Sequence, residues 1–251
     1  MSQPVPPTDL SPAGVELAAP KGPAHSQTLS RGIRALEILA EARDPMTIAE
    51  LSQALGVHRS IAYRILRTLE DHSLLMRGSA GRVQAGPGLA ALARGVSRDL
   101  QSAALPELTT LANDLAMTAF IAVWDQRDCV TLVTVEPRHT AAALVQHPGM
   151  RHSFASGAPG IAIQAAVGRE QWERQAPGQP FRPEAELARK VGYAVSHDEV
   201  IPGVSSVAVP VIVPGQPPAA ISVVYIRTTT STEDIAASLQ RAASAIEAEL
   251  R

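Results

Sequence analysis

The side chains best suited to chemistry lie on one face of a helix predicted for residues 58–72. This face carries Arg59, Ser60, Tyr63, Arg64 and Arg67. At about 100° per residue, the opposite arc carries a core-facing stripe formed by Ile61, Ala62, Ile65, Leu66 and Leu69. Guanidinium groups donate hydrogen bonds to phosphates and to the edges of bases. A helix that is packed on one side and cationic on the other is therefore suited to the major groove of double-stranded DNA.

The elements before this helix must position it. Thr47-Ile48-Ala49-Glu50 has the spacing of a capping box, which predicts that a helix starts there. Gly56 ends that helix, because glycine turns the chain without steric cost. A further helix is predicted at Leu29–Arg43, and Asp44-Pro45 ends it because proline disfavours helix in the preceding residue.

A short hairpin is predicted directly after the cationic helix. Its strands are Leu74-Leu75-Met76-Arg77 and Arg82-Val83-Gln84, separated by the glycine-containing turn Gly78-Ser79-Ala80-Gly81. Three helices followed by such a hairpin predict a winged helix-turn-helix. Arg77 and Arg82 flank the turn, where they either contact phosphates or a minor groove, or are simply solvated.

The charge distribution supports contact with a polyanion in this part of the chain only. The 251 residues carry a net charge of −2, but residues 26–98 hold ten arginines and six carboxylates, a balance of +4, while residues 99–251 sum to −5. Such a balance is also found on ordinary protein surfaces. The gathering of cationic side chains on one helical face is what favours nucleic acid.

The remaining sequence predicts a second domain. Residues 88–116 are predicted as a helical pair, with Pro106 opening the second helix. Strands and helices alternate afterwards, and antiparallel strands with helices at either end give an α+β fold with one sheet. The predicted strands are Ala119–Asp125, Cys129–Glu136, Ala142–Gln146, Tyr193–Ser196, Ser205–Val213 and Ala219–Arg227. The predicted helices are Gly157–Val167, Glu184–Val191 and one capped by Ser231 or Thr232.

Composition and motif absences narrow the function classes. Cys129 is the sole cysteine, which leaves no internal disulfide or cysteine-based zinc site and fits a reducing cytoplasm. Cys129 has no base at a catalytic spacing, Gly157-Ala158-Pro159-Gly160 lacks the Lys-Ser/Thr of a phosphate loop, and no His/Asp/Glu cluster has metal-ligand spacing. We therefore expect no enzyme activity, no catalytic residue, no metal and no cofactor.

Neither membrane nor export signals are expected. No apolar run approaches the roughly 20 residues of a membrane span. Residues 1–25 lack the basic start and apolar segment of a signal peptide, and their six prolines predict a disordered tail over residues 1–27. The expected domains are then 28–86 for the winged helix-turn-helix, 87–116 for linker helices and 117–251 for the second domain.

Several segments together resemble the IclR family of bacterial transcriptional regulators. In the first domain these are Leu29-Ser30-Arg31-Gly32-Ile33-Arg34-Ala35-Leu36-Glu37-Ile38-Leu39, Ile48-Ala49-Glu50-Leu51 and Tyr63-Arg64-Ile65-Leu66-Arg67-Thr68-Leu69. In the second they are Ser156-Gly157-Ala158-Pro159-Gly160, Gly192-Tyr193-Ala194 and Pro202-Gly203-Val204 through Ala208-Val209-Pro210-Val211. The likeness spans roughly residues 28–250, and its specificity comes from the order and spacing of the segments.

This resemblance implies a C-terminal effector-binding domain with a GAF-like fold. It implies dimers or dimers of dimers, palindromic operators, and small organic or aromatic acids as effectors. Effectors of such proteins contact the loop that matches Gly157 and Ala158, with Ser156 beside it, and the positions that match Ser196, Ser206 and Ser222. These serines are equally compatible with ordinary loop and sheet positions that satisfy local backbone groups.

The chain departs from the family pattern at this site. An acidic residue is usual near Ser196, a cysteine at Ser206 and a serine at Val224, so the pocket is expected to be less acidic and more apolar. The stretch 168–183 is shorter than usual and rich in Gly and Pro, which alters one predicted wall. The interpretation is an effector-responsive DNA-binding regulator, in the repressor class. The alternatives are a winged-helix module for protein–protein contact or, less favoured, an enzyme that uses the C-terminal domain.

Overall fold

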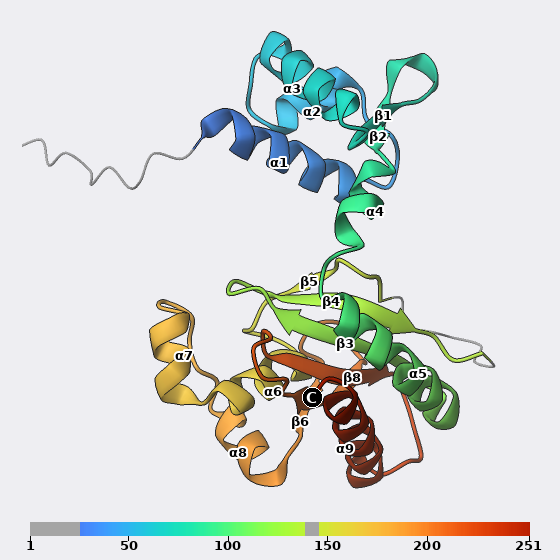
Figure 1. The fold of residues 1–251 in the computed structure, drawn as a ribbon, viewed down its shortest axis with the longest axis vertical. Helices are drawn as coiled ribbons and strands as arrows, with labels where there is room; N and C mark the ends of the chain where they lie inside the picture. Colours follow the sequence, from blue (N-terminus) through green and yellow to red (C-terminus); the bar gives the residue numbers. More distant parts are fainter. Residues whose placement is uncertain (1–25, 139–145) are drawn as a thin grey trace, which may run out of the picture. The chain divides into compact units, whose positions relative to one another are not determined.

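A computed structural model describes residues 26–138 and 146–251 and divides the chain into two compact units, Met1–Arg94 and Gly95–Arg251. The first unit contains helices α1 (Gln27–Glu41), α2 (Ile48–Ala54), α3 (Arg59–Asp71) and α4 (Gly88–Ala93). Strands β1 (Leu75–Arg77) and β2 (Val83–Ala85) form its antiparallel hairpin, with a short 3₁₀ turn at Ser79–Gly81. The predicted winged helix-turn-helix is confirmed (Figure 1).

Local caps set the helix boundaries in the first unit. The capping box is present in full: Thr47 Oγ1 accepts from the Glu50 amide at 3.2 Å, and Glu50 Oε2 accepts from the Thr47 amide at 2.7 Å. Gly56 follows α2 with a φ of +62°. Gly86 joins the hairpin to α4 where no side chain fits, because a Cβ there would lie 2.3 Å from the Ser73 carbonyl oxygen.

The core of the first unit lies between the three helices and the hairpin. It is built from Ala35, Leu39, Leu51, Ile65, Leu66, Leu69, Leu75 and Val83. Met46 extends the hairpin, because its backbone exchanges hydrogen bonds of 2.9 and 2.7 Å with Val83. One residue of the expected stripe differs: Ile61 is 37% exposed, since it lies at the edge of the apolar arc.

The second unit is built on a six-stranded antiparallel sheet with the order β5-β4-β3-β8-β7-β6. Its strands are β3 (Thr118–Trp124), β4 (Cys129–Val135), β5 (Arg151–His152), β6 (Ala194–His197), β7 (Ser205–Val211) and β8 (Ala219–Tyr225). Two longer helices, α5 (Arg98–Leu115) and α9 (Thr232–Glu249), cover one face (Figure 1). Helix α6 (Ala158–Val167) covers the other face, with α7 (Arg169–Gln175) and α8 (Glu184–Val191) packed against it. The α+β class is confirmed.

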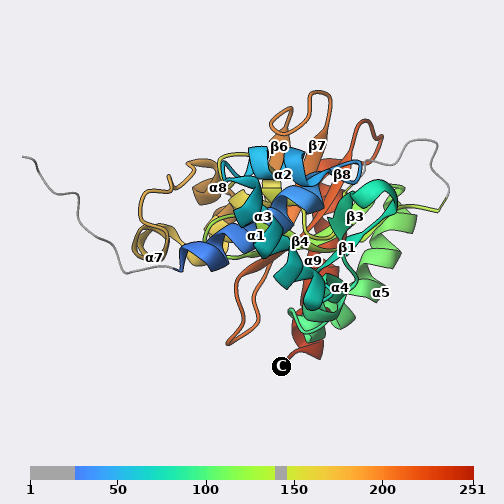
Figure 2. The same cartoon turned by 90° about the horizontal axis from the view of Figure 1, so that it is seen from above.

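Alternation along β3 divides the core of this unit into two. Ala119, Ile121 and Val123 pack toward α5 and α9, which lie side by side (Figure 2). Phe120 and Trp124 point to the opposite face and pack with residues of α6 and α7. Both faces of the sheet are therefore buried, and this explains why β3 has no exposed residue.

Three details of the second unit differ from the sequence predictions. Helix α5 continues through Pro106, where a new helix was expected to start. Proline has no N–H to donate to the carbonyl of Ser102, four residues earlier. Both Pro106 and Ser102 are exposed, so water can satisfy that carbonyl. No helix was predicted in the Gly- and Pro-rich stretch 168–183, but this stretch contains α7, whose Trp172 is fully buried. The short strand β5 was not predicted.

Two expected features cannot be compared with the structure. The Pro-rich tail falls on residues 1–25, and the strand expected at Ala142–Gln146 falls almost entirely on residues 139–145, both outside the described residues. Within the described residues, no helix is both long enough and apolar enough for a membrane span.

Candidate nucleic-acid interface and ligand cavity

Helix α3 presents a free cationic face. His58 caps it, with Nδ1 accepting from the Ser60 amide at 3.3 Å and lying 2.8 Å from the Ser60 hydroxyl. All five predicted reading residues, Arg59, Ser60, Tyr63, Arg64 and Arg67, are exposed. None of the three arginines forms an ion pair with any carboxylate in residues 26–138 or 146–251. Their guanidinium groups are thus available to an external anion.

The two wing arginines are engaged within the unit. Arg77 Nε donates to both carboxylate oxygens of Glu70, at 2.9 and 3.1 Å, and its guanidinium lies over the Tyr63 ring at 5.6 Å from the centroid. Arg82 donates to the Pro45 carbonyl at 2.8 Å and lies 3.7 Å from Glu50 Oε2. These contacts join the hairpin to α3 and to the start of α2. The wing arginines therefore differ from those on α3 in their free hydrogen-bonding capacity.

A cavity of about 90 Å³ lies in the second unit, at the N-terminal end of α6. It is bordered by β3, β5, β6, β7 and β8 and by the segment between β6 and β7. Its lining includes four of the six predicted effector residues, Ser156, Gly157, Ser196 and Ser206. The apolar part of the wall is made by Phe120, Met150, Pro159, Val200, Ile201, Val204 and Val224. The cavity is therefore small and mostly apolar, with a few polar groups.

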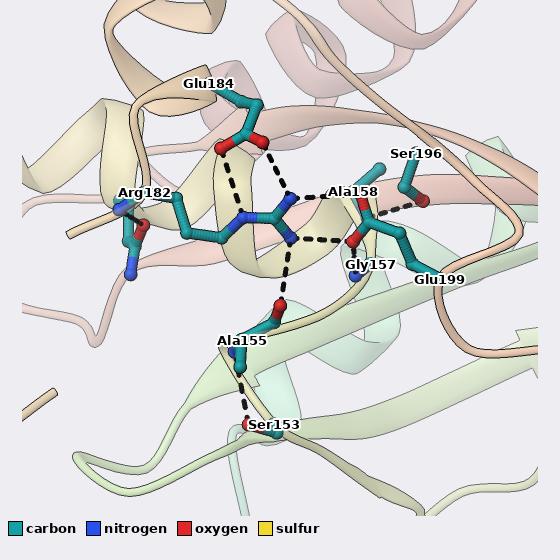
Figure 3. A network of polar contacts seen from close by, with 9 residues as sticks. Ser153, Ala155, Gly157, Ala158, Arg182, Glu184, Ser196 and Glu199 are labelled. Atoms are coloured by element: carbon teal, nitrogen blue, oxygen red, sulfur yellow. Dashed lines mark hydrogen bonds and ion pairs between the residues drawn. The ribbon is translucent and has the colours of Figure 1, made fainter. Parts of the chain in front are cut away.

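The loop before α6 directs two backbone amides at polar side chains of the chain itself. The Gly157 amide donates to Glu199 Oε2 at 2.7 Å, and the Ala158 amide donates to Ser196 Oγ at 3.0 Å (Figure 3). Gly157 has a φ of +90°, a conformation that other residues rarely adopt, so glycine is required for this loop shape. The amides predicted to meet an effector are thus hydrogen-bonded inside the protein.

Glu199 is held by a second partner, Arg182. The Arg182 guanidinium donates to the two Glu199 carboxylate oxygens at 2.7 and 3.0 Å, and it also contacts Glu184 and the Ala155 carbonyl (Figure 3). The hydrogen bonds from Arg182 lower the pKa of Glu199, against burial, which raises it. The same pairing raises the pKa of Arg182. Glu199 is therefore a carboxylate at neutral pH.

The predicted serines occupy different layers of the site. Ser206 Oγ lines the cavity and donates to the Val223 carbonyl at 3.0 Å. Ser222 Oγ lies 3.0 Å from Ser206 Oγ and donates to the Val207 carbonyl, but Ser222 is fully buried and does not line the cavity. The structure thus brings Ser206 to the cavity surface and leaves Ser222 behind it.

Besides Glu199, two polar residues of the wall, Gln146 and His152, were outside the predicted site. Gln146 Nε2 lies 2.9 Å from His152 Nε2 in a part-buried position. Burial lowers the pKa of His152, which favours the neutral imidazole that accepts this hydrogen bond.

Cys129, on the neighbouring strand, is buried among apolar residues, and burial raises the pKa of its thiol, which disfavours the nucleophilic thiolate.

Sequence reasoning missed Glu199 and Arg182, the central pair of the site, and the expectation of a less acidic pocket left out the Glu199 carboxylate in its wall. Glu199 ends the polar run Ser196-His197-Asp198-Glu199 before Pro202, which was a usable signal, whereas Arg182 had no local signal. Among the described residues, no three or more His, Cys, Asp or Glu side chains are placed together to hold a metal ion.

Comparisons with known proteins assign both units. Residues 28–78 match the model of the IclR helix-turn-helix domain, and residues 94–248 match that of the bacterial transcriptional regulator IclR C-terminal domain. Among curated proteins, the acetate operon repressor of Salmonella typhimurium is 29% identical over 150 residues, which cover 58% of this chain and 54% of that protein. This chain spans little more than half the length of two such relatives, 54% for the acetate operon repressor and 58% for the HTH-type transcriptional regulator Rv1719 of Mycobacterium tuberculosis.

Solved structures show the same fold. An IclR transcriptional regulator from Alicyclobacillus acidocaldarius superposes with a TM-score of 0.77 at 24% identity, covering 91% of this chain and 100% of that one. An IclR homologue from Microbacterium hydrocarbonoxydans, solved as a complex with 4-hydroxybenzoate, also gives a TM-score of 0.77 at 24% identity, over 89% of this chain and 99% of that one.

Proposed function

Because this chain belongs to the IclR family of bacterial transcriptional regulators, which are not enzymes, we propose that it binds an operator in double-stranded DNA under the control of a small organic metabolite. The observation that carries the proposal is the exposed cationic face of α3, with three guanidinium groups that have no ion-pair partner among the described residues. Phosphates and base edges are the partners that such a face fits. A regulator of this kind acts in the cytoplasm, where bacterial DNA lies.

In this proposal, α3 enters the major groove, with Arg59, Arg64 and Arg67 donating to phosphates and base edges. Ser60 and Tyr63 supply shorter contacts on the same face. Two chains related by a two-fold axis read the two halves of a palindromic operator, as a dimer or as a dimer of dimers. Repression is the expected direction, since one curated relative is the acetate operon repressor.

The proposed effector site is the cavity at the start of α6. Its size and largely apolar wall suit one small molecule, and its polar groups are few and convergent. The solved homologue that holds 4-hydroxybenzoate makes small aromatic compounds the first class to test. Effector binding would favour one arrangement of the effector units, and residues 87–116 would transmit it to the DNA-reading units.

The test is selection of DNA from a random double-stranded pool by the full-length protein. The wild type is expected to enrich a palindrome, and Arg64→Glu is expected to enrich nothing while keeping the wild-type melting temperature. The matched control is Arg174→Glu, a charge reversal at an exposed position of α7. Enrichment by Arg64→Glu equal to wild type would refute the reading face. No enrichment by the wild type would favour the protein–protein module.

A further inference from the structure

The cavity wall contains one ionised group, and that group is an acid. Among the described residues that line the cavity, Glu199 is the only carboxylate, and neither lysine nor arginine is present. Arg182 is the nearest compensating cation, but its side chain is only 11% exposed and its donors are used by Glu199, Glu184 and the Ala155 carbonyl. A ligand in this cavity therefore meets a negative charge whose counter-ion lies outside the wall.

Glu199 also takes the position that an acidic ligand would need. A free backbone amide at the start of a helix is a favourable seat for an anion. Here the Gly157 amide donates to Glu199 at 2.7 Å, and the Ala158 amide donates to the Ser196 hydroxyl at 3.0 Å. An incoming carboxylate must either displace Glu199 from three hydrogen bonds or remain beside it as a like charge.

We propose that Glu199 makes this cavity selective for uncharged, hydroxyl-bearing aromatic ligands over the corresponding carboxylates. The inference rests on the proposed function only in that it concerns the same effector cavity. Glu199 acts as an internal carboxylate that fills the anion seat, and the ligand occupies the apolar space next to it.

The remaining polar groups of the wall fit a hydroxyl group. Ser196 Oγ accepts from the Ala158 amide, and its own proton has no acceptor among the described residues, so it can donate to a ligand oxygen. Glu199 retains acceptor capacity for a ligand hydroxyl after its three hydrogen bonds. Phe120, Val200 and Ile201 supply the apolar surface for a ring. A small aromatic ligand with one hydroxyl group can thus hydrogen-bond to the polar residues of the wall while its ring packs against the apolar ones.

The experiment compares matched pairs of probes by isothermal titration calorimetry on the full-length protein. The pairs are benzyl alcohol with benzoate, and 4-hydroxybenzyl alcohol with 4-hydroxybenzoate. For the wild type, we expect at least one alcohol to bind about tenfold or more tightly than its acid partner. Equal or tighter binding of the acids, or no binding of either alcohol, would overturn the inference without the need for any variant.

A substitution identifies the cause of the preference. Glu199→Gln removes the resident charge and its ion pair with Arg182, so the ratio of alcohol to acid affinity is expected to fall about tenfold or more. The matched control is Glu170→Gln, at an exposed position of α7, which is expected to leave the ratio unchanged. A ratio unaffected by Glu199→Gln in a variant with a wild-type melting transition would refute the role of Glu199. The DNA selection above contains no ligand, so its failure is distinguishable from a failure here.

Discussion

Replacing Arg64 by alanine tests whether the α3 face makes charge contacts with DNA. Arg64 is exposed, and no carboxylate in the described chain pairs with it. Besides the helical backbone hydrogen bonds, its carbonyl accepts from Thr68 Oγ1 at 3.2 Å, and the substitution keeps that bond. The change in unfolding free energy is therefore expected to stay within about 0.5 kcal/mol.

The effect on DNA binding follows from counterion release. Each phosphate contact contributes about 0.9 to the slope of log affinity against log salt concentration, so two chains on one operator lose about 1.8. Between about 50 and about 200 mM salt, this difference in slope corresponds to a roughly tenfold difference in the loss of affinity. If Arg64 instead reads a base edge, affinity falls by about 1–3 kcal/mol per contact with less change in slope.

The assay is fluorescence anisotropy with the selected DNA at several salt concentrations. Arg174→Ala provides the matched control, since it also removes one exposed arginine, here from α7 in the other unit. Wild-type affinity together with a wild-type salt slope for Arg64→Ala would contradict the assignment of α3 as the reading helix.

Four further substitutions or conditions test the site and the fold. Ser206→Leu should block binding of the alcohol probes while DNA affinity is retained. An unchanged calorimetric titration would show that the probes bind outside this cavity. Trp172→Ala should lower the unfolding free energy by about 3–5 kcal/mol in urea, because a fully buried indole stacked on Trp124 is removed; a loss below about 1 kcal/mol would contradict this packing. Thr47→Ala should cost about 0.5–2 kcal/mol in the same assay, since the cap of α2 is lost, and equal stability would refute that account. The pKa of Glu199 is lowered from 4.5, so the ionised carboxylate stabilises the fold above that pH, and this stabilisation is lost as the pH falls through the lowered pKa. The difference in melting temperature between the wild type and Glu199→Gln should therefore shrink from pH 7 to pH 3. A constant difference would exclude this linkage.

The first unit was predictable because its signals are local. The hydroxyl of Thr47 and the carboxylate of Glu50 are three residues apart, and both halves of the capping box form. The glycine-containing turn after Arg77 also forms the expected hairpin. In each case, the sequence pattern and the stabilising contact involve the same few residues, so no knowledge of the rest of the fold was needed.

The errors arose where exposure or distant packing decides the structure. Pro106 continues a helix because its unpaired carbonyl partner is on the exposed side of α5, a fact that the sequence does not contain. Trp172 gives α7 its buried anchor through rings from β3 and from Phe154, far away along the chain. Short helices and two-residue strands such as β5 carry too little periodicity to be recognised.

The site shows the same division between local and distant information. The resemblance pointed to the Gly157 loop, which lines the cavity. The group that binds its amide, Glu199, is 42 residues away along the chain, and Arg182 comes from yet another segment. Val224 and Ser222 alternate onto the same face of β8, but only Val224 lines the cavity. Ser222 is separated from the cavity because Ser206 lies against it. Side-chain chemistry at a shared surface is thus the part that sequence spacing alone does not reveal.

The ion pairs of the first unit suggest how the arginines divide their roles. The sequence left Arg77 and Arg82 either as contacts to phosphates or a minor groove or as solvated side chains, and the structure pairs them with Glu70, Glu50 and the Pro45 carbonyl. A phosphate would have to compete with these partners, whereas it meets Arg64 unpaired. We infer that the wing arginines mainly fix the position of the hairpin relative to α3, and that α3 presents unpaired guanidinium groups to DNA. The geometry of the reading surface is then set before DNA arrives, which reduces the ordering cost of binding.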